Sequence, residues 1–556
     1  MGVSVNCLIM VLLAVLGSGA AAAQEETRYQ DHRALSQHLR SLANQHPELV
    51  SIDVLGESPE GREVWLITMG AGETSSHPAL LVAGGVEGDD LAGGEICLRL
   101  IERLLRDYGA VDSVSRLLEN STFYIVPRLN PDAAECLLRA PRYARDVNGR
   151  SVDEDRDGLT DEDGPDDVNG DGIITQMRVE DPEGSWLRDP DDPQLLRQAD
   201  IPAGERGQYR LLCEGVDNDK DGSFNEDGAG GVDLNANFST AHAPFDPRSG
   251  PYPLSETETR GFADFCFSHA NIAAVFTFSR QSNLLTPWES EEAGVDEEQW
   301  IPRHKVLAGD APYLQRLRDS YARITSLEKG PDAEKGAGAL SEWAYYHFGR
   351  WSVSVPAWWP RADDDGEKSA DPEKKDPIAR MRRDLHGLEK MGAADAFLEW
   401  QRVPHPDFQD AVVEIGGFRP GVTVNPPADS LSAVADRHIA FLLHLGMSLP
   451  RLDIAEVDVD ALDDRLYRIT LVLANRGYLP GNTRVGARLP WAPGVAVSIA
   501  LDRDQRLVSG RMIHIVDILE DSAKISWIVS TPRGRPVTLT AGSPMTGYVE
   551  RTVELR

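Results

Sequence analysis

The segment Leu80-Leu81-Val82-Ala83-Gly84-Gly85-Val86-Glu87-Gly88-Asp89-Asp90-Leu91 joins an apolar run to a helix-like stretch through two glycines. Residues 79–83 are wholly apolar, as in a strand that is buried on both faces of a sheet. Residues 91–108 have the apolar spacing of an amphipathic helix. The junction carries an acidic pair, Glu87 and Asp90, three residues apart. The segment therefore predicts a strand–turn–helix unit with carboxylates where the strand ends.

The same alternation continues on both sides of this unit. The pattern predicts strands at residues 49–54, 64–69, 121–126, 272–278 and 410–415, and helices at residues 29–46, 256–265 and 378–400. Strands that alternate with helices predict an α/β fold, here an α/β/α sandwich around a mixed, mostly parallel sheet. We assign this domain to residues 24–448.

Two polar segments interrupt the α/β pattern. Residues 150–230 are rich in Asp, Asn and Gly and have few periodic apolar residues, which indicates an insertion. Residues 361–375 form a charge run, which indicates a surface loop.

From residue 450 to 556 short β-rich segments follow one another between turn signals, which predicts an all-β sandwich domain. This domain has no catalytic cluster, so a stabilising or binding role is its default interpretation.

The charge balance limits the classes of partner. The chain has 556 residues, with 56 Lys and Arg against 90 Asp and Glu, for a net charge of −34. Nucleic acid and anionic membranes repel such a surface, so neither is an expected partner. An acidic surface suits a protein that binds cations, although it is equally typical of a merely well-solvated protein.

The N-terminal residues have the features of an export signal. Residues 8–16 are a short apolar core, and Ala21, Ala22 and Ala23 offer small side chains for cleavage. No later stretch has the ~20 apolar residues of a membrane span. We therefore expect residues 1–23 to be a signal peptide, and the mature protein to be secreted or periplasmic.

The cysteines of the mature protein are expected to be structural, either buried or bridged, and their spacing does not fix a pairing. They are Cys97, Cys136, Cys213 and Cys266.

Three loops in the insertion place side-chain oxygens at alternate positions beside a glycine. Such oxygens converge on one hard cation, and like-charged carboxylates repel one another without it. Three loops with this spacing favour structural calcium over a merely solvated acidic segment. None has the glutamate that closes an EF-hand, so other residues must complete the sites. The candidate ligands are Asp153, Asp155, Asp157, Asp161, Asp167, Asn169, Asp171, Asp217, Asp219, Asp221 and Asn225.

Several short motifs occur in one order along the chain. They are Gly-Glu-Ser-Pro-Glu-Gly-Arg at residues 56–62, Gly-Gly-Val-Glu-Gly-Asp-Asp at 84–90, Pro-Arg-Leu-Asn-Pro-Asp at 127–132, Val-Asp-Leu-Asn-Ala-Asn-Phe at 232–238, Gly-Pro-Tyr-Pro-Leu-Ser-Glu at 250–256 and Val-Glu-Ile-Gly-Gly at 413–417. In this order the set resembles the zinc carboxypeptidase family, the carboxypeptidase A-like metallopeptidases. The resemblance spans residues 29–446.

The resemblance implies an α/β fold and the removal of C-terminal residues from peptides by a zinc-bound water. That chemistry needs three protein ligands and an open position on the metal. The family takes its ligands from His-x-x-Glu and a later histidine, and those positions here are Glu87, Asp90 and Ser279. No histidine remains among them, and two carboxylates without imidazole suit harder cations than zinc.

Other family positions also differ. The Asn-Arg pair that holds the substrate's terminal carboxylate is Asn235-Ala236 here, so the bidentate arginine is lost. A second family arginine has no certain counterpart; Arg142, Arg145 and Arg150 are the candidates. Glu414 stands at the place of the general base.

Two hypotheses follow from this set of differences. The first is a catalytically degenerate member that binds peptide, including protein C-termini, or another extracellular polymer in the former active-site cleft, with structural calcium. The second is an active carboxypeptidase with an atypical metal site built from Glu87, Asp90 and Glu414. The loss of every zinc ligand and of the carboxylate-binding arginine favours the first.

Overall fold

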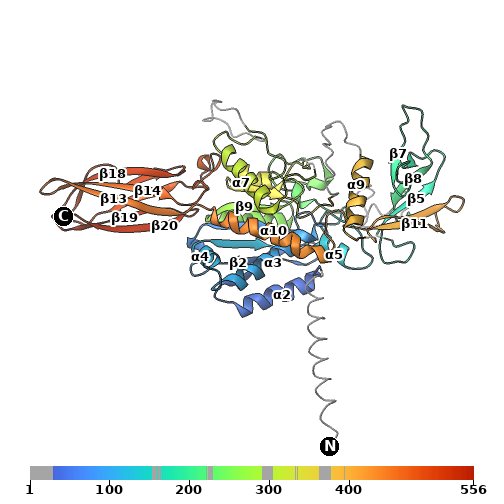
Figure 1. Cartoon of the computed structure of the whole chain (residues 1–556), viewed down its shortest axis with the longest axis horizontal. Helices are drawn as coiled ribbons and strands as arrows, with labels where there is room; N and C mark the ends of the chain where they lie inside the picture. The colour runs from blue at the N-terminus through green and yellow to red at the C-terminus, as the bar shows by residue number, and fades with distance from the viewer. Residues whose placement is uncertain are drawn as a thin grey trace, which may run out of the picture.

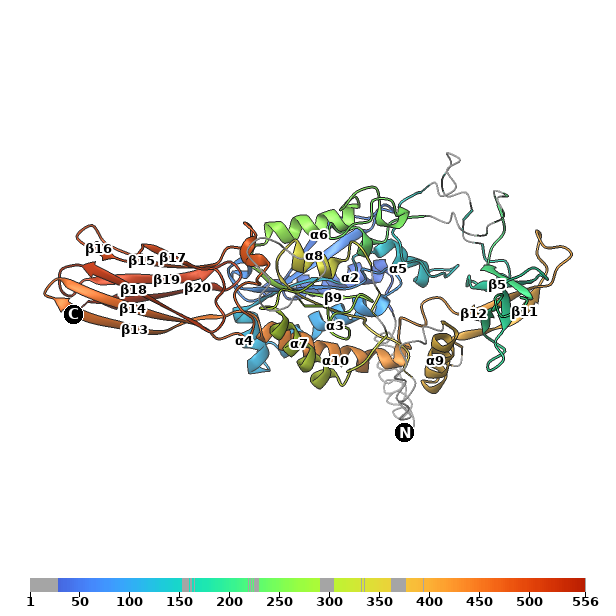
Figure 2. The same ribbon diagram turned by 90° about the horizontal axis from the view of Figure 1, so that it is seen from above.

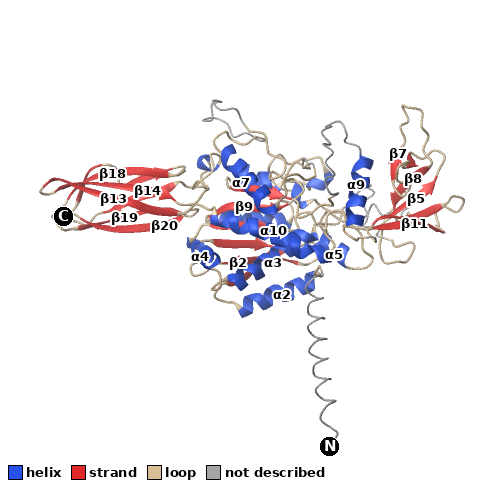
Figure 3. Cartoon of the chain, in the orientation of Figure 1, coloured by secondary structure: helices blue, strands red, loops and turns tan. Residues whose placement is uncertain are grey.

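The protein is described from a computed structural model. The structure describes residues 29–152, 160, 163–164, 166–218, 220, 222, 224, 230–290, 305–331, 333–334, 336–361, 377–393 and 395–555. The expected signal peptide lies outside these residues. The described part is elongated, with an α/β domain in the middle, a small β-sheet at one end and a β-sandwich at the other (Figures 1 and 3).

A mixed six-stranded sheet forms the centre of the α/β domain, with strand order β1-β2-β4-β3-β9-β10. Pairs β3–β4, β3–β9 and β9–β10 are parallel, and pairs β1–β2 and β2–β4 are antiparallel. This confirms the predicted α/β fold with a mixed sheet. The strands are β1 (Val50–Glu57), β2 (Glu63–Met69), β3 (Ala79–Ala83), β4 (Thr122–Val126), β9 (Ile272–Phe278) and β10 (Trp351–Val355).

Helices cover both faces of this sheet because its strands bury alternate side chains in opposite directions. Leu80 and Val82 of β3 belong to one apolar cluster and Leu81 and Ala83 to the other. Helices α2 (His32–Gln45), α3 (Leu91–Asp107), α4 (Asp112–Asn120), α7 (Ala311–Thr325) and α10 (Ala428–Met447) contribute to the first cluster. Helices α6 (Thr257–Ser268) and α8 (Leu340–Tyr346) cover the other face (Figure 2).

A second six-stranded sheet stands beside the α/β domain, with strand order β11-β12-β5-β8-β6-β7. The polar insertion therefore contains strands that its sequence pattern did not predict. The expected helix at residues 378–400 is also only partly right, since α9 ends at Lys390 and a strand follows it. The elements are β5 (Gln176–Glu180), β6 (Trp186–Arg188), β7 (Leu196–Gln198), β8 (Tyr209–Cys213), α9 (Pro377–Lys390), β11 (Phe397–Val403) and β12 (Val413–Phe418).

The C-terminal domain is the predicted β-sandwich. Its two four-stranded sheets have orders β13-β14-β18-β16 and β17-β15-β19-β20 and enclose a separate apolar cluster that includes Trp527. The strands are β13 (Leu452–Asp463), β14 (Leu466–Asn475), β15 (Val495–Ala500), β16 (Arg506–Ser509), β17 (Ile513–Val516), β18 (Ser522–Ser530), β19 (Pro536–Ser543) and β20 (Gly547–Glu554). The remaining helices are α5 (Pro131–Leu138), η1 (Thr74–Ser76), η2 (Leu234–Ala236), η3 (Pro247–Ser249) and η4 (Gly486–Arg488).

The four cysteines beyond residue 28 are free thiols, so none is bridged. Cys97 and Cys266 are buried, Cys136 is half-buried and Cys213 is exposed. Within the residues described above, no helix has both the length and the apolar composition needed to cross a bilayer.

Candidate functional site

The turn after β3 brings Glu87 into the interior at the carboxyl end of the sheet. Gly85 has φ 56°, a left-handed conformation that favours glycine. A Cβ atom on Gly84 would lie 2.7 Å from the backbone of Gly93, so glycine is also needed for the close approach of α3. The Glu87 side chain that follows this turn is only 5% exposed.

Glu87 accepts hydrogen bonds from three donors on one oxygen. Its Oε1 accepts from Ser279 Oγ at 2.7 Å, from Asn235 Nδ2 at 2.9 Å and from the Arg280 backbone N–H at 3.2 Å. Ser279 directly follows β9, which is parallel to β3, so the two strand ends meet at the same edge. Burial raises the pKa of Glu87. Within the described part of the chain, its second oxygen, Oε2, is buried and has no hydrogen-bond partner.

Asp90 is the N-cap of α3. Its Oδ1 accepts a hydrogen bond from the Gly93 N–H at 2.9 Å, as the first-turn amides of a helix require. The pKa of Asp90 is raised to about 7, chiefly by burial and also by the neighbouring carboxylates Glu87 and Asp89, although the hydrogen bond from the Gly93 N–H lowers it. The carboxyl group is therefore part of the helix start.

Asn235 and Ala236 lie in η2, beside Ser279. The Asn235 amide donates to both Glu87 and Ser279 Oγ, the latter at 3.0 Å, and its oxygen accepts from the Leu340 N–H at 3.0 Å. The structure thus brings together Glu87, Ser279 and Asn235 as one hydrogen-bonded group. Ala236 supplies no cation at the position where the family holds a carboxylate.

Two residues that the sequence patterns did not single out complete the site. The Arg280 guanidinium binds Asp89 through both terminal nitrogens, at 3.1 and 2.6 Å. Burial lowers the pKa of Arg280, but Asp89 and Glu87 outweigh it and the net shift is upward. Asp89 is adjacent to Asp90 and Arg280 is adjacent to Ser279 in the sequence, so their closeness to the family's ligand positions could have drawn attention to both residues. Arg280 is therefore neutralised by the site itself.

Carboxylates also line the more exposed rim of the site. Burial, followed by Glu87 and Asp146, raises the pKa of Asp233 to about 7. The Asp233 side chain is 25% exposed, and Arg248 lies 3.8 Å from it while binding Asp146. The site as a whole therefore has an acidic character.

Glu414 lies elsewhere. Strand β12 belongs to the second sheet, well apart from β9 (Figure 2). Glu414 accepts a hydrogen bond from Arg178 Nε at 2.8 Å, and the Arg178 guanidinium stacks 4.4 Å from the Trp400 ring. In the main sheet the neighbours of β9 are β3 and β10, and the Ser279 N–H donates to the Val355 carbonyl at the end of β10, at 2.9 Å. The structure does not bring Glu414 to the Glu87 group.

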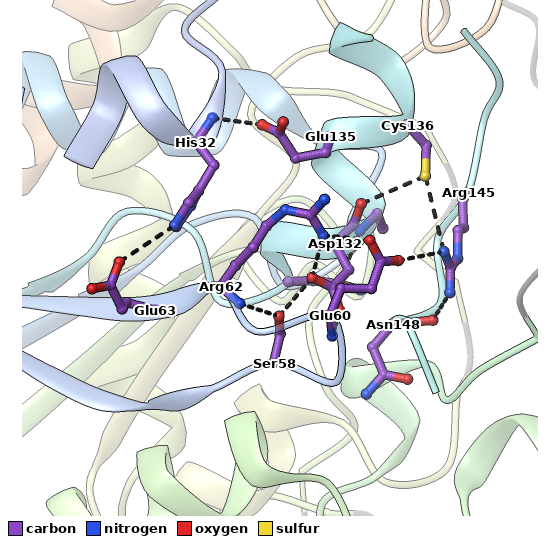
Figure 4. A network of polar contacts seen from close by, with 12 residues as sticks. His32, Ser58, Glu60, Arg62, Glu63, Asp132, Glu135, Cys136, Arg145 and Asn148 are labelled. Atoms are coloured by element: carbon purple, nitrogen blue, oxygen red, sulfur yellow. Dashed lines mark hydrogen bonds and ion pairs between the residues drawn. The ribbon is translucent and has the colours of Figure 1, made fainter. Parts of the chain in front are cut away.

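The three candidate arginines have different surroundings. Arg145 is buried, donates to Glu60 at 3.2 Å and also bonds the carbonyl of Asn148 (Figure 4). Arg150 binds Glu256 at 2.8 Å. Arg142 is exposed on the wall of a separate groove. Arg145 and Arg150 are therefore held by carboxylates of the chain.

Part of the acidic insertion is described. In its second loop, Asp167 accepts hydrogen bonds from the N–H groups of Gly170 at 2.8 Å and Gly172 at 2.6 Å. In the third, Asn218 donates to Asp163 at 2.9 Å and Asp166 at 2.8 Å, so segments far apart in sequence meet. The described candidate ligands are Asp167, Asn169, Asp171 and Asp217. Asp153, Asp155, Asp157, Asp161, Asp219, Asp221 and Asn225 lie outside the described residues.

The family's zinc does not fit these side chains. Ser279 donates a hydrogen bond to Glu87, Asp90 caps a helix, and no histidine is present among these ligand positions. Three histidines elsewhere in the chain could in principle offer an imidazole, but His242, His269 and His347 each contact an oxygen of another residue, at 2.8 to 2.9 Å. Across the described residues, no group of three or more His, Cys, Asp or Glu side chains is arranged to hold a metal ion.

Comparison with known proteins gives consistent matches. A family model for zinc carboxypeptidases matches residues 35–162 and 200–358, and one for a domain of unknown function matches residues 451–554. Carboxypeptidase B of Astacus astacus is 25% identical over 264 residues, which cover 47% of this chain and 65% of that protein. Human carboxypeptidase D is 32% identical over 111 residues, 19% of this chain and 8% of that protein. The chain thus spans less than two thirds of these relatives' lengths.

Solved structures are similar over large parts of the chain. Thrombin activatable fibrinolysis inhibitor has a TM-score of 0.42 and 12% identity, over 76% of this chain and 74% of that chain. Carboxypeptidase A from Helicoverpa armigera has a TM-score of 0.36 and 16% identity, over 59% of this chain and 64% of that chain. Because the family model matches more than half of the sequence, this chain belongs to the zinc carboxypeptidase family.

Proposed function

We propose that this protein is a non-hydrolytic member of the zinc carboxypeptidase family that binds polypeptide at the former active site. One observation carries the proposal: the side chains at the ligand positions are engaged within the protein, Ser279 and Glu87 with each other and Asp90 with the N–H of Gly93. A hydrolytic site needs these positions for a metal and an activated water. The placement of Glu414 in the second sheet also supports the proposal.

The chemistry of the rim indicates the kind of peptide. Without an arginine at position 236 the site lacks a bidentate partner for a C-terminal carboxylate. Asp233 and Asp146 stand at the accessible edge and share one cation, Arg248, so above the pKa of Asp233, about 7, the edge keeps excess negative charge that attracts a further cation. We therefore expect the bound polypeptide to present Lys or Arg side chains to this rim.

Calcium and export are further parts of the proposal. The acidic insertion would hold calcium for stability, with Asp167, Asn169, Asp171 and Asp217 among its ligands. The contacts of Asn218 with Asp163 and Asp166 support this role, because they gather acidic residues that repel one another without a cation. Export would place the protein where calcium is plentiful.

The alternative is an active carboxypeptidase with an atypical metal site. The observation in its favour is Glu87 Oε2, which is buried and has no hydrogen-bond partner among the described residues. A hard cation beside Glu87 and Asp90 would satisfy that oxygen. Glu414, its proposed base, lies in the other sheet and binds Arg178.

Binding and cleavage of the same peptides separate these hypotheses. Fluorescently labelled oligolysine and oligoglutamate peptides would be titrated with the protein and then analysed by mass spectrometry. We expect the cationic peptide to bind more tightly, Asp233→Asn to weaken it, and neither peptide to lose residues. Asp458→Asn, an exposed change in β13, is the matched control. Stepwise loss of C-terminal residues from either peptide would contradict the proposal. Equal affinity for oligolysine and oligoglutamate would contradict it as well.

A further inference from the structure

Strand β17 is an unusually apolar edge strand. It pairs with β15 on one side only and forms the edge of its sheet in the sandwich. Ile513 is 56% exposed and Ile515 is 58% exposed, and both point to the outer face of the sheet. Met512, which precedes the strand, is also exposed. Proteins normally protect sheet edges with charges, prolines or covering segments, so an apolar edge of this kind indicates an interface.

The backbone of β17 has hydrogen-bonding groups directed away from its sheet. The Ile499 N–H donates to the Met512 carbonyl at 3.1 Å, so the backbone groups of Met512 face β15. In an antiparallel ladder the backbone groups of successive residues point to opposite sides, so those of His514 also face β15. The N–H and C=O groups of Ile513 and Ile515 therefore point to the open edge, where a further strand can pair with them.

The exposed residues of this strand and of the positions that flank it are complementary to their own reverse order. Arg511, Ile513, Ile515 and Asp517 are all exposed, in the order cation, apolar, apolar, anion. When two copies of the strand run antiparallel about His514, Ile513 of each lies opposite Ile515 of the other, and these are the residues whose free backbone groups meet. Arg511 and Asp517 flank the strand, so Arg511 of each copy comes to the same end of the pair as Asp517 of the other. The Arg511 backbone takes no part in this pairing, because its N–H and C=O already bond His514 and Trp527.

We propose that β17 is a homodimerisation edge, at which two copies of this chain pair these strands and join their sheets into one continuous sheet. A C2 axis through the His514 pair satisfies the requirement that a self-complementary patch meet its own copy. Other registers fit less well. A shift of two residues places Ile513 opposite Asp517, or Arg511 opposite Ile515, and loses the charge pairing. The interface lies in the C-terminal domain, so it stands independently of the proposed peptide-binding function.

Sedimentation equilibrium of the full chain tests the proposal through charge exchange. We expect a dimer that Arg511→Asp and Asp517→Arg each weaken about tenfold, because each change converts both symmetric ion pairs into repulsions. The double variant Arg511→Asp/Asp517→Arg restores the dimer. An equimolar mixture of the two single variants forms a heterodimer, because opposite charges again face each other.

Tyr548→Lys is the matched control, since Tyr548 is 65% exposed on β20 at the opposite edge of the same sheet. It leaves the dimer unchanged, whereas Ile515→Lys abolishes it. A monomer at every concentration overturns the proposal. A dimer that both single charge variants leave intact, or that the double variant fails to restore, overturns it as well. The restoration arm also separates lost pairing from misfolding.

Discussion

Ser279 donates a 2.7 Å hydrogen bond to Glu87, and both residues stand where the zinc carboxypeptidase family has histidine ligands. The two side chains come from adjacent parallel strand ends, β9 and β3, so the fold still gathers these positions at one edge of its sheet. The side chains that the sequence motifs predict at two ligand positions are therefore close together, and they form an internal hydrogen bond.

Ser279→Ala should destabilise the fold by about 1–3 kcal/mol, because it leaves a buried carboxylate oxygen with fewer donors. Urea denaturation of the purified variant measures this loss. Ser75→Ala is the matched control, since Ser75 makes the same 2.7 Å bond to Glu73 at the exposed surface. If both variants lose the same free energy of unfolding, the buried Ser279–Glu87 bond stabilises the fold no more than an exposed one.

Asp90→Asn should stabilise the protein at pH 8. The pKa of Asp90 rises from 3.8 to about 7 on burial, so the folded state prefers the protonated group. Stability from this group is present at low pH and is lost as pH rises through about 7. Asparagine caps the helix equally well and stays neutral, so it should add roughly 1–3 kcal/mol at pH 8.

Thermal unfolding at pH 4 and pH 8 measures this effect of Asp90→Asn. The gain should be confined to the higher pH, where the wild-type carboxylate is ionised. Asp112→Asn, at the exposed start of α4, serves as the control and should change little at either pH. A variant that loses stability at pH 8 would contradict the assignment of Asp90 as a buried helix cap.

Calcium should raise the unfolding temperature, and a chelator should lower it. A bound ion stabilises the folded state by about 2.7 kcal/mol at a concentration of 100 Kd. Asp167→Ala should remove part of this increment because it deletes a predicted ligand, whereas Asp458→Ala should retain all of it. Differential scanning calorimetry with and without calcium decides the matter. An unfolding temperature that is indifferent to calcium would exclude structural calcium.

Glu414→Gln should weaken the second sheet by about 2–3 kcal/mol. The Arg178 side chain is only 4% exposed, and it would lose the carboxylate that balances its buried charge. Arg402→Gln, on the exposed neighbouring strand, should change stability by less than about 0.5 kcal/mol. Chemical denaturation compares the two variants. If Glu414→Gln has no effect on stability, Arg178 and Glu414 do not support the sheet as inferred.

The main sheet and the sandwich were predictable because their strands carry local signals. Residues 79–83 and 272–278 are continuous apolar runs, and the β-rich C-terminal segments recur between turn residues. Of the second sheet only β12 was anticipated, by the strand predicted at residues 410–415. The other strands escaped prediction because they are only three to seven residues long and depend on distant partners. Arg178 in β5 pairs with Glu414 in β12, 236 residues away, which no local pattern can reveal.

The site was predictable to a similar degree. Motif order located Glu87, Ser279 and Asn235, which the structure joins by hydrogen bonds. The same motif order placed Glu414 with them, although its sheet partner puts it elsewhere. Arg280 and Asp89 stand next to motif positions in the sequence, but their ion pair depends on the approach of two strand ends and is seen only in the structure.

Zinc content and peptidase activity, measured together on the full chain, test the central claim most directly. The protein would be dialysed against buffer with equimolar zinc, analysed by mass spectrometry for bound metal, and incubated with a panel of peptides. The Ser279–Glu87 hydrogen bond and the Asp90 helix cap predict no retained zinc and no release of C-terminal residues. One zinc ion per chain with release that a chelator abolishes would contradict the account.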